Sequence, residues 1–539
     1  MSHPNSSRTP AVVLDRVSFS WPDGTPVLRD TSVAFGPGRT GVVGANGAGK
    51  STLLRLVGGR LRPQAGSVTT HGEVGYLPQQ VTLATDATVA DLLGVRAVLD
   101  ALRAIERGEV SEAVFEAVGD AWDVEARSAA VLDAIGLSAI GLDRPVGTLS
   151  GGETVLTALA GLRLAGFPVV LLDEPTNNLD RPSRRRLREQ LESWRGALLV
   201  VSHDRALLDL MDDTAEVRDE AVSVFGGGFT AFTEHVEQED AAARQALRTA
   251  EQALRAERRQ RIAAETAIAR RERAGRTARE NREAPPIIMN QRKSNAQAAA
   301  GRLRGTLDGR VEAARRAVDE QAARVREDDG IRVDLPDPQV PSGRRLAELH
   351  DGERVVVLQG PERVALVGRN GIGKTRLLEQ LVGRLDRGTR HAADHDVSAV
   401  ALTERIGYLP QRLDHLADEQ SVLDAVRAAA PGAAVGEVRS RLARFGLRGA
   451  DVERPVGTLS GGERFRVALA RLLLADPPSQ LLVLDEPTNS LDRSSVDALV
   501  NALSGYRGAM LVVSHDDELL SRLAVDRWLE LDEDGLRER

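Results

Sequence analysis

Two copies of one phosphate-binding motif, at residues 44–51 and 368–375, constrain the fold of this 539-residue chain more than any other feature. Both fit the pattern G-x-x-x-x-G-K-[ST]. In this pattern the glycines turn backbone N–H groups towards the phosphates, the lysine neutralises them, and the final hydroxyl binds magnesium. The pair therefore predicts two nucleotide-binding α/β domains in one chain.

The same further motifs follow each phosphate loop in the same order. They are Gly-Tyr-Leu-Pro-Gln (75–79 and 407–411), Leu-Ser-Gly-Gly-Glu (149–153 and 459–463), Leu-Asp-Glu-Pro-Thr-Asn (172–177 and 484–489) and Val-Ser-His-Asp (201–204 and 513–516). The last three pairs are offset by 310, 312 and 312 residues. This regularity indicates a tandem duplication.

Short, unbroken apolar runs precede the acidic pair in both halves, at residues 169–172 and 481–484. Runs of this kind are typical of buried parallel strands, and they place Asp and Glu at the carboxyl edge of a sheet, where α/β folds bind ligands. Residues 196–201 and 508–513 have the same character. We expect a mixed, helix-flanked sheet in each half.

A long helical linker is predicted between the halves. Residues 236–284 contain no proline and are rich in helix-forming residues, and two prolines, 285 and 286, must interrupt them. A second helix follows with an apolar stripe that includes Leu303 and Leu307; the first has a weaker stripe that includes Ile262 and Ile268. We expect an antiparallel hairpin with its tip near 283–298.

The expected organisation is therefore a flexible N-terminus (1–10), a first nucleotide-binding domain (11–235) with a short arm-like insertion within about 80–130, the linker (236–330), and a second domain (331–539).

Charge is distributed unevenly along the chain. The net charge is −8, yet residues 241–330 carry 21 basic against 13 acidic side chains, a local +8. A basic arm on an acidic body suits a polyanionic partner, nucleic acid first. The alternative is a solvated helical linker, because charge runs on helices usually face water.

Composition excludes several classes of site. The chain has no cysteine, so disulfides, thiolate zinc sites and iron–sulfur clusters are absent, and a cytoplasmic setting is expected. Residues 1–10 lack the apolar core of a signal peptide, and no apolar run reaches the roughly 18–20 residues that span a bilayer.

The acidic pairs and histidines are the candidate catalytic residues. Asp173 and Asp485 suit magnesium binding, together with Ser51, Thr375, Gln79 and Gln411. Glu174 and Glu486 suit polarisation of the water that attacks the γ-phosphate. His203 and His515 can contact that phosphate.

The remaining cofactor-binding candidates belong to the phosphate loops, the signature motifs and one upstream aromatic residue. Trp21 can stack on adenine, with a core tryptophan of an edge strand as the alternative. The others are Gly44, Asn46, Gly47, Gly49, Lys50, Thr52, Ser150, Gly151 and Gly152 in the first half, and Gly368, Asn370, Gly371, Gly373, Lys374, Arg376, Ser460, Gly461 and Gly462 in the second.

These motifs resemble the ATP-binding cassette superfamily over nearly the whole chain, and two cassettes joined by a charged helical hairpin are similar to the ABC-F family. The resemblance implies a cytoplasmic, monomeric ATPase of translation that uses ATP and Mg²⁺ and has no stable membrane subunit. It also implies ribosome binding near the tRNA exit site, with the linker tip directed at the peptidyl-transferase centre and contacts to rRNA and tRNA. Some members dislodge antibiotics, and others act on stalled ribosomes.

The family further implies that the cassettes close face to face around two ATP molecules. Ser460 and Gly462 would then complete the first site, and Ser150 and Gly152 the second.

The sequence departs from the family pattern in the second cassette. It has no aromatic counterpart to Trp21 upstream of Gly368, and Arg376 replaces the small residue often found after the phosphate-loop hydroxyl.

The linker tip combines apolar and cationic side chains. The candidate RNA-binding residues are Arg276, Arg279, Arg282, Ile287, Ile288, Met289, Arg292 and Lys293.

Two rival functions stay open on the sequence alone. One is the ATPase subunit of an exporter whose membrane subunits are separate chains, although such a motor has no evident use for the basic hairpin. The weaker rival is a DNA-repair ATPase, which needs zinc hooks or far longer coils.

Overall fold

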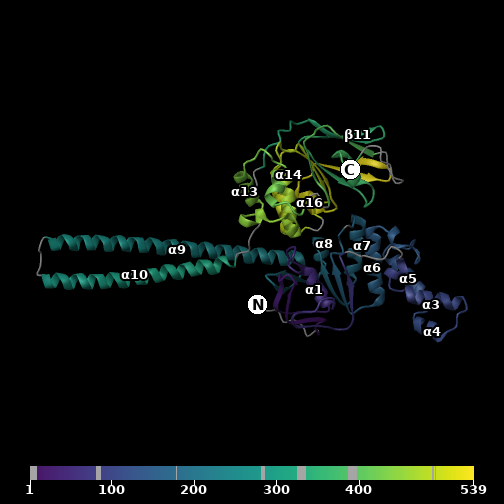
Figure 1. Ribbon diagram of the computed structural model, residues 1–539. Coiled ribbons are helices and arrows are strands. Elements are labelled where there is room, and N and C mark those ends of the chain that lie inside the picture. Colours follow the sequence, from purple (N-terminus) through teal and green to yellow (C-terminus); the bar gives the residue numbers. More distant parts are fainter. Residues whose placement is uncertain are drawn as a thin grey trace. The chain divides into compact units, whose positions relative to one another are not determined.

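The computed structural model describes the chain except residues 1–8, 80–86, 178, 281–285, 325–334, 386–396, 412, 414–415, 489–490 and 492. Most of the expected flexible N-terminus, 1–10, lies outside the described residues. The chain divides into a unit that holds both cassettes (Met1–Phe229 with Asp329–Arg539) and a linker unit (Thr230–Asp328). Figure 1 shows these elements coloured along the sequence.

A six-stranded mixed sheet forms the centre of the first cassette, as predicted. Its order is β5 (Val74–Leu77), β6 (Val169–Asp173), β7 (Ala197–Val201), β3 (Arg39–Val43), β8 (Asp213–Arg218) and β9 (Ala221–Gly226). All neighbours pair in parallel except β8 and β9.

Both faces of this sheet are covered, which explains its unbroken apolar strands. Along β6, Val169 and Leu171 pack with α1 (Lys50–Val57), while Val170 and Leu172 pack with α6 (Gly151–Ala165) on the other face. The helices α7 (Arg181–Glu192) and α8 (Arg205–Leu208) complete that second layer.

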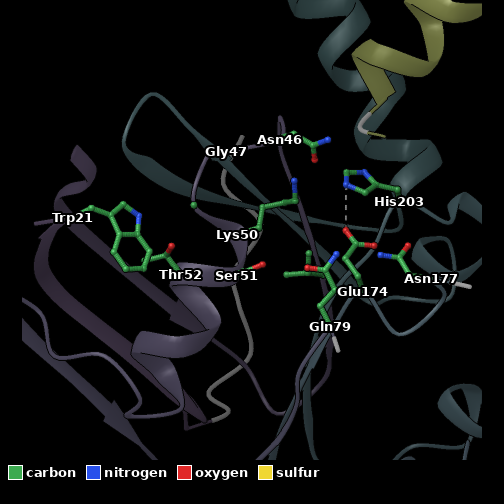
Figure 2. A pocket seen from close by; sticks show the side chains of 12 residues that line it. Trp21, Asn46, Gly47, Lys50, Ser51, Thr52, Gln79, Glu174, Asn177 and His203 are labelled. Atoms are coloured by element: carbon green, nitrogen blue, oxygen red, sulfur yellow. Dashed lines mark ion pairs between the residues drawn. The ribbon is translucent and has the colours of Figure 1, made fainter. Parts of the chain in front are cut away.

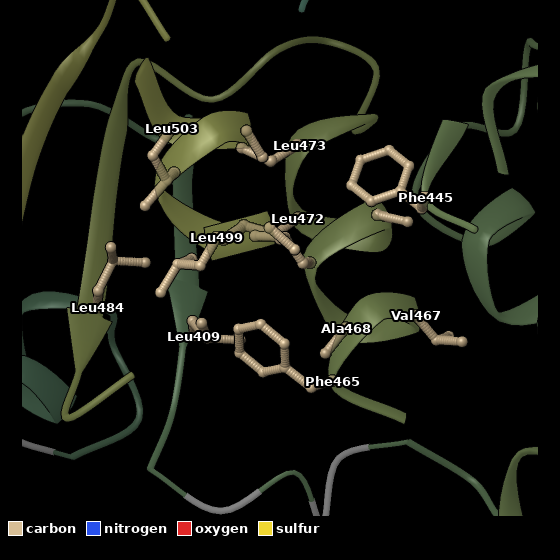
Figure 3. Packing of buried hydrophobic residues seen from close by; sticks show 14 of the residues in the cluster. Leu409, Phe445, Phe465, Val467, Ala468, Leu472, Leu473, Leu484, Leu499 and Leu503 are labelled. Atoms are coloured by element: carbon tan, nitrogen blue, oxygen red, sulfur yellow. The ribbon is translucent and has the colours of Figure 1, made fainter. Parts of the chain in front are cut away.

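The second cassette repeats this plan. Its sheet runs β14 (Ile406–Leu409), β15 (Leu481–Asp485), β16 (Ala509–Val513), β12 (Arg363–Val367), β17 (Arg527–Asp532) and β18 (Gly535–Glu538). One face packs against α11 (Lys374–Leu381). The other packs against α14 (Gly461–Leu473), α15 (Arg493–Ser504) and α16 (Asp517–Arg522), and Figure 3 shows Phe465 and Leu472 of α14 directed at Leu409 and Leu499.

A three-stranded antiparallel sheet accompanies each central sheet. In the first cassette it is β2 (Pro26–Phe35), β1 (Val12–Ser20) and β4 (Ala65–Thr70); in the second it is β11 (Arg354–Gln359), β10 (Arg345–Asp351) and β13 (Val397–Ala401).

The helical region before each signature motif differs between the cassettes. The first has α2 (Val89–Leu92), α3 (Arg96–Glu106), α4 (Glu112–Val118) and α5 (Val124–Ala134) with one short 3₁₀ turn. Among its described residues the second has α12 (Val422–Arg427) and α13 (Val435–Arg444) with two short 3₁₀ turns. The helices α3 to α5 fall in the region expected to hold the arm-like insertion.

The linker unit is an antiparallel helical hairpin, α9 (Phe229–Glu280) and α10 (Pro286–Ala322), which Figure 1 shows side by side. Arg261 Nε lies 2.9 Å from Asp308 Oδ1, and Arg304 lies 3.8 Å from Glu272 further along. Buried Ile268 and Leu307 belong to the predicted apolar stripes.

Three details of the linker prediction were wrong. The first helix begins at Phe229 rather than at residue 236. The second begins at Pro286, so 286–298 is helical, because proline fits the first position of a helix, whose N–H needs no partner. Ile262 and Leu303 are 63% and 43% exposed, so the packed stripe is narrower than predicted.

No helix in the described part of the chain is long and apolar enough to cross a membrane.

Candidate functional site

Each phosphate loop connects the central sheet to a helix through glycines in the left-handed backbone conformation, which other residues rarely adopt. Gly47 and Gly49 have φ of 83° and 103°, and Gly371 and Gly373 have 81° and 105°. The loop therefore curls, and Lys50 and Lys374 begin helices α1 and α11. A helix N-terminus below a ring of backbone N–H groups is an anion-binding site.

The lysine of each loop is buried and held by the loop itself. Lys50 Nζ donates to the carbonyl oxygens of Gly44 and Ala45 at 2.9 and 3.0 Å. Lys374 Nζ donates to those of Gly368 and Arg369 at 2.6 and 2.9 Å. A buried ammonium that donates to carbonyl oxygens of its own loop is placed to attract a phosphate, whose charge would offset its own desolvation.

A cavity that is open to solvent adjoins the first phosphate loop. Its lining comes from the loop, the hairpin β1–β2 and the carboxyl ends of β6 and β7. The lining residues are Trp21, Asn46, Gly47, Gly49, Lys50, Ser51, Thr52, Gln79, Glu174, Asn177, Val201 and His203. Figure 2 shows Trp21 and Glu174 on opposite sides of Lys50 and Ser51.

Most first-cassette candidates are thus brought together, and Asn177 was missed. Asn177 ends the repeated Leu-Asp-Glu-Pro-Thr-Asn motif, and that repetition was the available signal. The signature residues Ser150, Gly151 and Gly152 lie outside this cavity, at the start of α6.

A serine and an aspartate meet where magnesium is expected. Ser51 Oγ donates to Asp173 Oδ1 at 2.9 Å, and the Tyr76 hydroxyl donates to Asp173 Oδ2 at 3.2 Å. Burial raises the pKa of Asp173, against these two hydrogen bonds, which lower it. Tyr76 was not among the candidates, although its motif repeats.

The counterparts in the second cassette are Thr375 and Asp485, and here the aspartate has fewer hydrogen bonds. Burial raises the pKa of Asp485. Neither of its oxygens makes a hydrogen bond of good geometry, although the Thr375 and Tyr408 hydroxyls favour its charged form. An orphaned buried carboxylate beside a hydroxyl fits a hard cation such as Mg²⁺.

The donor set fits a cation that phosphates and water hold together with the protein. Among the described residues no three His, Cys, Asp or Glu side chains cluster as a protein-only metal site. Mg²⁺ is commonly bound by one or two protein groups together with substrate phosphates and water, which these residues fit.

A strained glutamate follows each aspartate. Glu174 and Glu486 have φ of 50° and 46°, in the left-handed region that side chains rarely adopt. Their N–H groups donate to the carbonyls of Val201 and Val513 at 2.9 and 2.8 Å, which ties each glutamate to the neighbouring strand. Strain of this kind persists where surrounding structure imposes it, as at functional sites.

Burial raises the pKa of Glu174 and of Glu486 to about 7. A carboxyl with a pKa near physiological pH can accept a proton from water during turnover.

A histidine faces each glutamate across the sheet edge. His203 Nε2 lies 3.1 Å from Glu174 Oε1, the contact drawn in Figure 2, and His515 Nε2 lies 3.4 Å from Glu486 Oε1. His515 Nε2 also lies 3.0 Å from Asn370 Oδ1 and 3.3 Å from Lys374 Nζ. Burial, then the Lys374 charge, lowers the pKa of His515 to about 3, so this ring is neutral at pH 7.

Both signature motifs form capping boxes at helix starts. Ser150 N donates to Glu153 Oε2 at 2.7 Å and Ser460 N donates to Glu463 Oε2 at 2.8 Å, while each serine oxygen accepts from the glutamate N–H. Ser150 and Ser460 are exposed. Each motif therefore presents a hydroxyl and the free N–H groups of a helix to solvent.

The other candidates are placed as follows. Gln79 lines the first cavity, and Gln411 is exposed after β14. Gly461 and Gly462 begin α14 after Ser460. Arg276 is exposed on α9; Arg282 and the side chains of Arg279, Ile287, Ile288, Met289, Arg292 and Lys293 lie outside the described part of the chain.

Comparison with known proteins identifies both cassettes. The family model described as ABC transporter matches residues 28–177 and 356–489. The tylosin resistance ATP-binding protein TlrC of Streptomyces fradiae is 35% identical over 93% of this chain and 94% of its own. The energy-dependent translational throttle protein EttA of Mycobacterium tuberculosis is 30% identical over 92% and 87%.

Solved structures agree on the fold. The archaeal ribosome recycling factor aABCE1, solved with the ribosomal stalk protein aP1, superposes over 97% of this chain and 89% of its own with a TM-score of 0.54 and 20% identity. The duplicated cassette, the intact phosphate loops and the two full-length relatives agree: the chain is an ATPase that belongs to the ABC-F family of ATP-binding cassette proteins.

Proposed function

We propose that this protein is an ATP-driven, ribosome-binding factor of translation. In this proposal ATP and Mg²⁺ close the two cassettes, the closed form binds the ribosome, and hydrolysis releases it. The name of one relative denotes tylosin resistance and that of another translational throttling, which supports an activity in translation. The two forms of that activity in this proposal are protection of the ribosome against an antibiotic and relief of stalled ribosomes.

The observation that carries the proposal is the linker hairpin between two complete cassettes. The two helices α9 and α10 comprise 52 and 37 residues. Basic side chains outnumber acidic ones along the linker, by 21 to 13 over residues 241–330. A long basic hairpin suits phosphate contacts with structured RNA, and a transport motor has no evident use for it.

The site roles follow the geometry of each cassette. Asp173 and Asp485 would hold Mg²⁺ with Ser51 and Thr375, which together with the lysine neutralises the phosphates. Glu174 and Glu486 would orient and polarise the attacking water, and His203 and His515 would contact the γ-phosphate from the next strand. Gln79 and Gln411 would reach the same cation.

The closed form would share each nucleotide between the cassettes. The exposed hydroxyls and helix N-termini of the signature motifs are phosphate sites without a lysine. Ser460 with Gly462 would complete the first site, and Ser150 with Gly152 the second.

Translation in a reconstituted system tests the function. Replacement of both Glu174 and Glu486 by Gln keeps the nucleotide contacts and removes water activation, so the variant should lock on the ribosome and stop protein synthesis in ATP. The wild type should inhibit far less, because it cycles off. If the double variant bound ATP without hydrolysing it and yet left translation unaffected, the exporter alternative would replace this proposal.

A further inference from the structure

The two cassettes also differ in the hairpin that stands before the phosphate loop. In the first, Leu14 of β1 pairs with Val33 of β2, so residues 15–32 form the end of the hairpin. In the second, the buried counterpart Leu349 of β10 pairs with Val356 of β11, which leaves residues 350–355. The second hairpin is therefore twelve residues shorter beyond this matched rung.

The longer hairpin end covers the first phosphate loop. Its strand β2 brings Val27 against Gly49, where an added Cβ would lie only 2.2 Å from a Val27 methyl carbon. Trp21 follows β1, packs edge-on against Phe19 with ring centroids 5.3 Å apart, and lines the cavity with Thr52 and Lys50. This places one aromatic face at the end of the cavity away from Glu174 (Figure 2).

Among the described residues, the shorter hairpin does not reach the second phosphate loop at the same point. Strand β10 ends at Asp351, which pairs directly with Arg354 across a two-residue turn. An added Cβ at Gly373, the counterpart of Gly49, would meet no described atom within 4 Å. Residues 330–407 contain no Phe, Trp or Tyr, so this stretch has no ring of that size to take the place of Trp21.

The phosphate-binding parts of the second loop are nevertheless intact. Lys374 and the left-handed glycines match those of the first loop, and Asp485 matches Asp173. Arg376 stands in the place of Thr52 and is half-buried in the first turn of α11. A guanidinium binds phosphate, a group that all nucleoside triphosphates share, so Arg376 suits the triphosphate rather than the base.

We infer that the second site binds nucleoside triphosphates through the triphosphate and its cation alone, without selecting the base, whereas the first site prefers purines through Trp21. This inference rests on the proposed nucleotide sites and specifies their ligands. Stacking strength grows with the size of the base, so the first site should favour ATP over UTP. The second should accept both.

Two variants that each leave one working site provide the test. In the first-site protein, Lys374→Ala removes the second site and Glu174→Gln prevents turnover. In the second-site protein, Lys50→Ala removes the first site and Glu486→Gln prevents turnover at the second. Binding of ATP and of UTP, each with Mg²⁺, is measured by calorimetry on the full-length chain.

The first-site protein should bind ATP about fivefold or more tightly than UTP, and the second-site protein should bind the two within about twofold. Adding Trp21→Ala to the first-site protein should bring its ratio to that of the second. Trp21→Phe keeps a ring and should keep most of the preference, which separates stacking from a folding defect.

An ATP preference in the second-site protein equal to that in the first would overturn the inference while leaving the two nucleotide sites established. Absence of ATP binding by both proteins would overturn the proposed sites themselves.

Discussion

His203 Nε2 lies 3.1 Å from Glu174 Oε1, so the residues that end two adjacent parallel strands meet at one edge of the first sheet. The equivalent pair in the second cassette, His515 and Glu486, lies at 3.4 Å. Both glutamates are buried and strained, and each has one carboxylate oxygen that makes no hydrogen bond of good geometry. Such a group is costly to the fold, which supports a functional reason for it.

Replacement of Glu174 and Glu486 together by Gln should reduce ATP turnover by about 10²–10⁴-fold, the range expected when a positioned base is lost. ATP affinity should change little, because the phosphate loops are untouched. Phosphate release and ATP binding are measured on the same preparation. Near-normal phosphate release by this variant would contradict the assignment of the glutamates.

The nucleotide-free protein should show the effect of these glutamates on stability. Because burial raises their pKa to about 7 from an ordinary value of 4.5, the folded chain binds more protons than the unfolded chain between these pH values. The contribution of these groups to stability therefore falls as pH rises through that window.

Glutamine resembles the protonated acid, so the Glu174→Gln, Glu486→Gln variant should melt a few degrees above the wild type at pH 8 and close to it at pH 5. Each kcal/mol of added stability is expected to raise the melting temperature by about 2–4 °C. Scanning calorimetry in EDTA without nucleotide measures this. Exposed Glu112 and Glu116 provide a control with the same change of charge. If the difference in melting temperature between variant and wild type were equal at both pH values, burial would not raise the pKa of these glutamates.

The hydroxyl beside each aspartate offers a test of the cation site. In the first-site protein, Ser51→Ala should raise the Mg²⁺ concentration needed for ATP binding by about tenfold or more, because one ligand is lost. Ser51→Thr should not, since the second cassette itself has Thr375 at this position. Titration of ATP binding with Mg²⁺ distinguishes the two variants. Equal midpoints for Ser51→Ala and Ser51→Thr would mean that Ser51 is not a ligand of the cation.

The linker tip should matter for translation and not for hydrolysis. Replacement of Ile287, Ile288, Met289 and Lys293 by Ser should leave the ATPase rate of the free protein nearly unchanged, because these residues belong to the linker unit. The effect on translation should be lost. Ribosome affinity should fall only in part, because the flanking arginines still contact phosphate.

Exposed apolar residues elsewhere on the same hairpin make the matched control. Ile262→Ser with Leu303→Ser removes two of them from α9 and α10. This control should keep its activity in translation. Equal activity of the tip variant and the control would show that the tip is only a turn.

The sequence predicted the parts of the fold that repeated motifs and apolar runs determine. Residues 169–172 and 481–484 fall within buried parallel strands because both faces of the sheet are covered. The start of the second linker helix was missed because Pro286 was taken to interrupt a helix rather than to begin one. Exposure of Ile262 and Leu303 depends on which turns of two long helices touch, which periodicity alone does not determine.

Pairing between distant segments was the part that no local pattern revealed. The sequence showed that the second cassette has no counterpart to Trp21 upstream of Gly368. It did not show which feature of the fold accounts for this difference. Only the strand register shows that the second hairpin closes at Asp351 and Arg354. Its end is therefore too short to include a position equivalent to Trp21.

Co-sedimentation with ribosomes tests the central claim most directly. The Glu174→Gln, Glu486→Gln variant should pellet with ribosomes in ATP at low salt and remain in the supernatant in ADP. Its binding should weaken steeply as salt is raised, because phosphate contacts release counterions. Failure of this variant to pellet with ribosomes in ATP at low salt, under conditions where it binds ATP, would contradict the account.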